Sequence, residues 1–456
     1  NRRISRGNRG VANRNVVGEA RFLNMPTEQA TSMPARNIEQ SHTIGRMRRN
    51  LTRLASGSII AQAVVAVSTP ILTRLYEPDA FGAAALFTAA YGLIIPLVTL
   101  KYDQAVIMPK AQNRAMSIGA MVMVIATVNS LIVGVGVLAY LLFLPERREL
   151  SWLLLPVALW LGAAFTLMQQ WSSRMSNYTH YARSQVVGAV VNVSICTGAA
   201  LAFSGRPVFI VLGFTAGMGV SLAYTIRGFK SWPYRSQAFR IRALARQIKA
   251  YGSFPALVLP TAVVTVVGAN GIPFLLASHY SLEEVGVFAV ANRVLVIPAA
   301  IVGGALAEAV RSEFAASQRA RELVTPIFRK AFTQIIILAV VLFGGIYLVA
   351  PDALSFLFGM QYAASGATAQ ALILAAFSQF ICAPFVYVFA ILRRPAMGLL
   401  GQVLLALVPL GALVLFSRLA VPLNNALFMY SFCALVGAVV MLALVYRGCK
   451  SFDARG

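Results

Sequence analysis

The stretch Val285 to Glu308, VGVFAVANRVLVIPAAIVGGALAE, decides the fold class, because it is apolar and long enough to cross a bilayer. It carries Arg293 near its middle. A central arginine in a membrane helix costs from about 2.5 to well above 10 kcal/mol unless it faces protein or water. The stretch therefore predicts a transmembrane helix whose arginine faces a polar interior.

The composition of the whole chain agrees with this stretch. Of 456 residues, 58% are hydrophobic and 12% are charged, and the mean hydropathy is +0.73. One soluble core cannot hide so much apolar surface, so we expect an all-α polytopic membrane protein. The net charge of +24 does not indicate a nucleic-acid partner, because most basic residues lie between apolar segments.

The sequence lacks the usual signatures of an enzyme. It has no Walker loop, zinc motif or nucleophile elbow, and no large outer loop with paired carboxylates for glycosyl transfer or polymerisation. Its four cysteines and three histidines are scattered, without the spacing of a metal site or a disulfide framework. We therefore expect a transporter without a cofactor, apart from a coupling ion, either a proton or Na⁺.

Apolar windows of about 20 residues predict twelve membrane spans. Basic residues concentrate in alternate connections, while the other connections hold only Arg147, Arg148, Arg206 and Arg418. By the positive-inside rule, this asymmetry predicts that both termini are cytoplasmic and that the span count is even. The expected spans are 56–75, 81–100, 115–144, 151–171, 185–203, 208–226, 253–276, 285–308, 331–350, 367–391, 397–417 and 425–446.

The longest basic connection divides the chain into two six-helix lobes, 51–226 and 253–446. The connection itself, 227–252, is either an interfacial amphipathic helix or a solvated linker. Residues 1–50 read as a disordered basic extension, with Met47 as a hypothetical native start, and 447–456 as a cytoplasmic tail. The domain plan is therefore extension, lobe, linker, lobe and tail.

The first hairpin of each lobe carries a similar turn. The sequence YEPDAFG at 76–82 is echoed by YSLEEVG at 280–286, as a parallel duplication predicts. Prolines also fall in the first two spans of both lobes, and each removes a helical hydrogen bond. We expect them to bend helices that rock between two openings, although proline is also simply common in membrane helices. These helix-bending residues are Pro70, Pro96, Pro273 and Pro298.

Few charged residues lie at membrane depth. Arg293, Arg74 and Lys101 form a cationic set, which would suit phosphate or another anion if the three side chains converge. For Arg74 and Lys101, snorkelling to the interface is the simpler alternative. Asp103 and Glu308 are expected to serve as counter-ions or ion-coupling groups, or to have only structural roles. Amides at other positions suit either a sugar passage or helix-to-helix hydrogen bonds: Gln169, Gln170, Asn192, Gln379 and Gln402.

Two windows resemble a known family. TPILTRLYEPDAFGAAALFTAAYGLIIPLVTLKYDQAVIMPK (69–110) is similar to the opening hairpin of polysaccharide-export flippases of the multidrug/oligosaccharidyl-lipid/polysaccharide (MOP) superfamily. GVFAVANRVLVIPAAIVGGALAEAV (286–310) resembles the region of the seventh and eighth spans in the same family. By position, Arg74, Lys101, Asp103 and Arg293 match charged places of these windows, whereas Glu308 stands where a neutral polar residue is expected.

The resemblance implies a MOP-type fold and a function. It implies a flippase that moves undecaprenyl-pyrophosphate-linked oligosaccharide across the bacterial inner membrane by alternating access, for O-antigen, exopolysaccharide or capsule biosynthesis. The implied partners are this lipid-linked substrate, membrane lipids, and polysaccharide polymerase or export components. A multidrug/cation antiporter on the same fold is the nearest alternative, and a membrane glycosyltransferase or polymerase is a more distant one.

Overall fold

The structure, a computed structural model, describes residues 57–143, 149–229, 241–320, 323–386, 388–392 and 395–454. These residues form helices of several types and no strand. The expected extension 1–50 and residues 230–240 of the expected linker lie outside the described residues. The fold class predicted from composition, an all-α membrane protein, is therefore confirmed.

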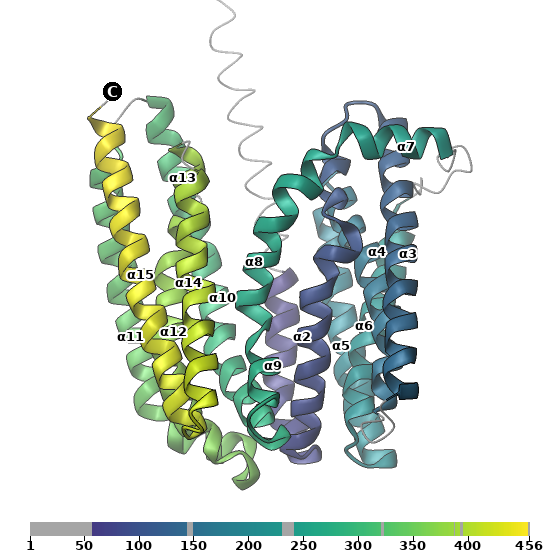
Figure 1. The fold of residues 1–456 in the computed structure, drawn as a ribbon, viewed down its shortest axis with the longest axis vertical. Helices are drawn as coiled ribbons and strands as arrows, with labels where there is room; N and C mark the ends of the chain where they lie inside the picture. Colours follow the sequence, from purple (N-terminus) through teal and green to yellow (C-terminus); the bar gives the residue numbers. More distant parts are fainter. Residues whose placement is uncertain are drawn as a thin grey trace, which may run out of the picture. The chain divides into compact units, whose positions relative to one another are not determined.

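The N-terminal half consists of six long helices (Figure 1). The 3₁₀ helix η1 (Tyr102–Ile107) connects the second of these helices to the third. A second 3₁₀ helix, η3 (Leu150–Leu154), leads into the fourth. The six helices are Gly57–Leu75, α2 (Pro78–Thr99), α3 (Gln112–Phe143), α4 (Leu155–Arg174), α5 (Tyr178–Phe203) and α6 (Pro207–Arg227).

The C-terminal half begins with α7 (Ile241–Ala250), in the segment where an interfacial helix was one of the two expectations. Its location at the membrane surface stays a prediction. The remaining helices are α8 (Leu259–Asn270), α9 (Ile272–Ala277), α10 (Leu282–Ala320), α11 (Thr325–Phe358), α12 (Ala364–Cys382), α13 (Val388–Ile391), α14 (Pro395–Arg418) and α15 (Leu423–Asp453), with the short turns η5 (Phe254–Val258), η6 (Met360–Tyr362) and η7 (Ala383–Phe385).

Eleven helices among the described residues are long and apolar enough to span a membrane. The remaining expected span, 253–276, is present as a broken helix. It opens with the π turn η5, continues as α8 and restarts as α9 after Gly271. Pro260 and Pro273 stand in the first turns of α8 and α9, where their missing N–H groups are tolerated, so the breaks fall where the prolines allow them.

Helix α15 extends into the segment expected as a cytoplasmic tail, 447–456, and the cytoplasmic location of this segment stays a prediction. Helix α15 continues to Asp453, whose carboxylate accepts the backbone N–H groups of Val324 (2.8 Å) and Thr325 (2.9 Å). These N–H groups lie at the start of α11, where an α-helix leaves donors without partners. The additional turns of α15 therefore place a cap on another helix.

The four expected bending prolines occupy different helical positions. Pro70 lies within Gly57–Leu75, Pro96 and Pro298 lie inside α2 and α10, and Pro273 opens α9. Near Pro96, the Asn129 side chain of α3 donates to the carbonyl groups of Leu97 and Val98. The last turn of α2 thus finds a partner in a neighbouring helix, as membrane helices require. That these prolines bend the helices stays a prediction.

The two similar turns meet directly. Helices α2 and α10 cross so closely that a Cβ atom on Gly82 would overlap the carbonyl oxygen of Leu282. A Cβ atom on Gly286 would in turn overlap the carbonyl oxygen of Pro78. Gly82 lies four residues after Pro78, and Gly286 lies four residues after Leu282. The contact is therefore reciprocal, as it would be between two copies of one duplicated hairpin.

Candidate functional site

One cavity of about 530 Å³ lies among four helices of the described chain and a side chain of α4. Each of the four helices contributes residues at i, i+3, i+4 and i+7, which form a single face two turns long. The four faces are Ser58, Ala61, Gln62 and Val65 of Gly57–Leu75; Gln185, Gly188, Ala189 and Asn192 of α5; Phe214, Gly217, Met218 and Ser221 of α6; and Arg293, Val296, Ile297 and Ala300 of α10.

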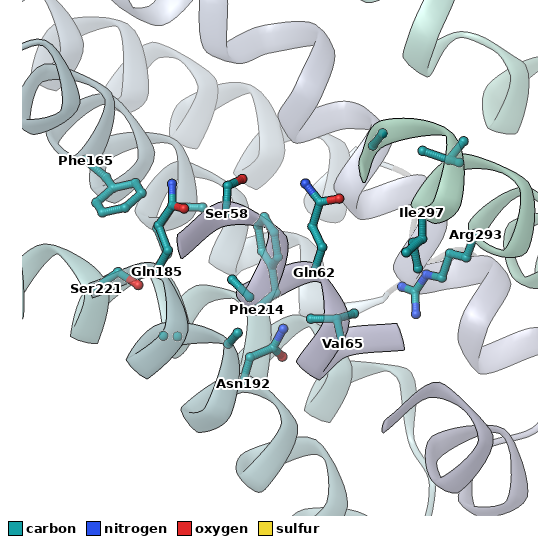
Figure 2. A pocket seen from close by; sticks show the side chains of 17 residues that line it. Ser58, Gln62, Val65, Phe165, Gln185, Asn192, Phe214, Ser221, Arg293 and Ile297 are labelled. Atoms are coloured by element: carbon teal, nitrogen blue, oxygen red, sulfur yellow. The ribbon is translucent and has the colours of Figure 1, made fainter. Parts of the chain in front are cut away.

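The cavity has two chemically different ends, and each lining face rises about 10 Å along its helix from the first residue to the last. Arg293 forms one end, near the turn between the first two helices. Gln185, Ser221 and Phe165 lie at the other end, and Gln62 stands between (Figure 2). The site is therefore cationic at one end and polar but uncharged at the other.

The Arg293 guanidinium points from α10 toward the other lining residues (Figure 2). The side chain is half-buried, and its Cζ lies 5.5 Å from the centroid of the Phe81 ring on α2. Such a cation–π contact stabilises the charge but satisfies none of the five N–H donors. No carboxylate or hydrogen-bond acceptor of the described residues pairs with Arg293. Its donors are free to bind an anion that enters the cavity.

The aromatic ring beneath Arg293 is fixed by its neighbours. Phe81 is only 2% exposed and meets Tyr76 and Tyr362 edge to face, with ring centroids 6.3 and 5.8 Å away. The Tyr362 hydroxyl donates to the Tyr76 carbonyl oxygen (3.0 Å), and the Tyr76 hydroxyl donates to the carbonyl oxygen of Cys196 (2.7 Å). These contacts join α2, α5 and η6 around the arginine. They hold the guanidinium in place without neutralising it.

The other charges on the cavity wall decide which ligand it suits. Among the described lining residues, none is acidic and Arg293 alone is charged. A cationic ligand would meet an uncompensated guanidinium in a medium of low dielectric constant, which is strongly unfavourable. An anion would be held by charge-assisted hydrogen bonds. The described residues also contain no group of three His, Cys, Asp or Glu side chains placed to hold a metal ion.

The structure does not bring the predicted cationic set together. Arg74 is exposed at the end of Gly57–Leu75, and Lys101 follows the far end of α2. The 22 residues of α2 separate them by about 33 Å. Neither residue lines the cavity that contains Arg293. These residues were grouped with Arg293 by charge, and the hairpin places them at opposite ends of a helix.

The two predicted acids also lie away from this cavity. Glu308 forms an exposed ion pair with Arg311, one helical turn further along α10. Such surface pairs contribute little stability. Asp103, in η1, is only 1% exposed, and its Oδ1 atom has no hydrogen-bond partner among the described residues. Burial raises the pKa of Asp103, and Thr99 and the Lys101 charge oppose that effect.

A pH-dependent stability is expected from Asp103. Because its pKa in the folded protein lies above the ordinary value of 3.8, the folded state binds the proton more tightly than the unfolded state. The stability due to this group is therefore full at low pH and is lost as the pH rises through the folded pKa. Asp103→Asn, which does not titrate, should flatten the pH dependence of the melting temperature in the range above the ordinary pKa of 3.8. A variant whose melting temperature follows the wild-type pH profile would contradict this explanation.

Sequence reasoning missed most of the neutral cavity wall. Of the five amides considered for a sugar passage, only Asn192 lines the cavity, whereas Gln62 and Gln185 were not singled out. The available signal was positional: Ser58, Gln62 and Gln185 belong to i, i+3, i+4, i+7 faces on helices that are otherwise apolar. Such a face is recognised as a cavity wall only when the other helices around it are known, and the structure supplies them.

The family of the chain follows from its sequence. A family model described as polysaccharide biosynthesis protein matches residues 71–367, a region that includes Arg293 and the four other predicted charged residues. The chain belongs to this polysaccharide biosynthesis family. Comparison with curated protein sequences gives no match. The family assignment confirms the resemblance seen in the two sequence windows, and both windows lie almost wholly within the matched region.

Solved structures support the fold of this family member. The lipid II flippase MurJ in its inward closed conformation aligns with a TM-score of 0.68 at 12% identity, covering 89% of this chain and 90% of that chain. An inward-facing multidrug resistance MATE family transporter of the MOP superfamily gives 0.66 at 14%, covering 86% and 96%. The Vibrio cholerae MATE transporter VcmN in the bent form gives 0.55 at 15%, covering 90% and 98%. At these identities the likeness establishes the fold, which is that of the MOP superfamily.

Proposed function

We propose that this multi-pass membrane protein is a flippase for lipid-linked oligosaccharides. Its substrate would be an oligosaccharide repeat unit on undecaprenyl pyrophosphate, moved from the cytoplasmic to the outer leaflet of the bacterial inner membrane for polysaccharide biosynthesis. The family supports the pathway, and the fold is one that transporters such as MurJ use. The single observation that carries the substrate class is the Arg293 guanidinium, which faces the cavity without a counter-ion among the described residues.

The diphosphate is the part of such a substrate that Arg293 would bind. A guanidinium stays charged at any physiological pH and presents a planar fork of donors that matches phosphate oxygens. The bound diphosphate would supply the missing counter-ion, and its own transfer from water would be offset by the arginine charge. The polyprenyl chain would remain in the lipid, because hydrocarbon already surrounds it there and its transfer into the cavity offers no hydrophobic gain.

Transport requires that the substrate can also leave this anion site. A carrier with two openings releases substrate only if the free energies of binding in the two states are similar. One arginine in a cavity without a second cation among the described lining residues suits moderate affinity. In this proposal the helices that carry the prolines move between the two openings, and a proton or Na⁺ gradient drives the cycle. Asp103 and Glu308 are the candidate coupling residues.

The lining residues argue against a multidrug/cation antiporter, because a cationic drug would face Arg293 with no acidic side chain among the described wall residues. A glycosyltransferase or polymerase would need catalytic carboxylates, and none lies in the described cavity wall.

In the proposal both termini are cytoplasmic, membrane lipids surround the helices, and polysaccharide polymerase or export components receive the product.

Reconstitution in liposomes tests the proposal directly. Purified protein is incorporated with either a fluorescent undecaprenyl-pyrophosphate-linked oligosaccharide or a lipophilic fluorescent cation. Exposure of the label to an impermeant quencher reports translocation. We expect the protein to speed translocation of the lipid-linked oligosaccharide and to leave the cation unaffected. Transport of the cation, without movement of the oligosaccharide, would replace this proposal with the antiporter.

A further inference from the structure

The uncharged part of the cavity wall has unused hydrogen-bonding groups. Gln62 forms no hydrogen bond with any described residue, although it stands on the cavity wall. The Gln185 side chain donates to the Tyr181 hydroxyl (3.0 Å), yet its Oε1 atom is buried without a partner. Buried amide groups without partners are rare in folded proteins. Gln62 is half-buried, so the buried amide atom without a partner is Gln185 Oε1, and both side chains line the same cavity.

An aromatic ring stands beside Gln185 (Figure 2). Phe165 lines the same end of the cavity and stacks on Tyr181, with ring centroids 5.2 Å apart. Because Tyr181 also receives the Gln185 hydrogen bond, the ring and the amide are positioned by one residue. An aromatic face carries partial negative charge and attracts C–H groups. Amides that bind hydroxyl groups beside a ring that accepts C–H groups together match a sugar ring, which has polar edges and apolar faces.

We propose that the uncharged part of the cavity wall, which runs from Gln62 to Gln185 and Phe165, binds the first sugar of the transported lipid, a neutral pyranose. This inference rests on the proposed function, in which Arg293 holds the diphosphate. The first sugar is bonded directly to the diphosphate, and each lining face rises about 10 Å along its helix, so both groups fit one ligand. The cavity volume, about 530 Å³, lies within the usual range for ligand sites.

The polyprenyl chain is a poorer occupant of this part of the cavity. A hydrocarbon would cover Gln62 and Gln185 without offering a hydrogen bond, and leaving buried amides unpaired is unfavourable. A second anionic group is also a poorer occupant, because no cation of the described lining residues stands in this part. The amide geometry therefore selects a neutral, hydroxyl-bearing group, and it assigns sugar discrimination to the N-terminal half of the chain.

Binding measurements with three lipids test the inference. The probes are undecaprenyl pyrophosphate and its singly glycosylated forms that carry glucose or galactose, measured by microscale thermophoresis with the full chain in nanodiscs. We expect wild type to bind at least one glycosylated lipid about tenfold more tightly than the bare lipid. Gln62→Leu and Gln185→Leu should each weaken glycosylated binding by about 3- to 10-fold and leave bare-lipid binding unchanged. Gln402→Leu, on α14 outside the cavity, is the matched control and should behave as wild type.

The outcomes separate this inference from the proposed function. Equal wild-type affinity for all three lipids would overturn the sugar site alone, whereas failure to bind any of them would overturn the proposed function as well. If Gln62→Leu lost affinity for the bare lipid and for the glycosylated lipids equally, the glutamine would not contact the sugar. Because Gln185 also bonds to Tyr181, unfolding of its variant is monitored by thermal melting. Because Gln62 has no such contact, the binding measured for Gln62→Leu tests the sugar site by itself.

Discussion

Gly286→Ala is expected to lower the melting temperature of the protein and to reduce its transport rate. Alanine normally stabilises a helix relative to glycine by about 1 kcal/mol. At this position, however, the added methyl group overlaps the backbone carbonyl oxygen of Pro78, which cannot rotate away as a side chain could. Helices α2 and α10 would have to separate, and overpacking of this kind costs about 1–3 kcal/mol.

The same helix offers a control for this substitution. Gly304 also lies in α10, but a Cβ atom there meets nothing within 4 Å. Gly304→Ala should therefore be neutral or slightly stabilising, and the pair separates contact from helix propensity. Thermal unfolding of the purified variants is the measurement. Equal melting temperatures for Gly286→Ala and Gly304→Ala would show that the α2–α10 crossing can open at little cost.

Arg293→Ala is expected to reduce the rate of lipid-linked oligosaccharide translocation by about 10- to 100-fold. Hydrogen bonds to charged groups contribute about 1.5–3 kcal/mol each, and 1.4 kcal/mol corresponds to a factor of ten. Arg293→Lys retains the charge and loses the planar fork, so an intermediate rate is expected. The assay is the quencher-based liposome measurement, with initial rates normalised to the amount of reconstituted protein.

Arg418→Ala provides the matched control for Arg293. This arginine ends α14, is exposed and does not line the cavity. Its replacement should leave the translocation rate within about twofold of wild type, as expected for an exposed surface residue. If Arg293→Ala folds normally and also translocates substrate at the wild-type rate, the anion does not bind at this arginine.

The membrane spans were predictable because bilayer thickness sets a length that apolar windows reveal directly. Helix α10 contains the whole predicted stretch 285–308, and α2 begins three residues before the predicted 81. The seventh predicted span is broken at Gly271, two residues before Pro273, which the sequence analysis had named as helix-bending. These features depend on one segment at a time, which is why the sequence alone contains them.

The cavity depends on several segments together and was only partly predictable. The energetic cost of a central charge singled out Arg293 before any neighbour was known. Its contact with Phe81 and the free amide of Gln62 depend on which faces of distant helices meet, and the sequence does not specify that pairing. Arg74 and Lys101 were grouped with Arg293 by charge, and the hairpin geometry places them apart.

Electron cryomicroscopy of the protein in nanodiscs with bound undecaprenyl-pyrophosphate-linked oligosaccharide tests the central claim most directly. The measured quantity is the distance from the diphosphate oxygens to the Arg293 guanidinium nitrogens. We predict about 2.7–2.9 Å, the length of a charge-assisted hydrogen bond. A diphosphate bound outside this cavity, for example at Arg74 or Lys101, would contradict the account.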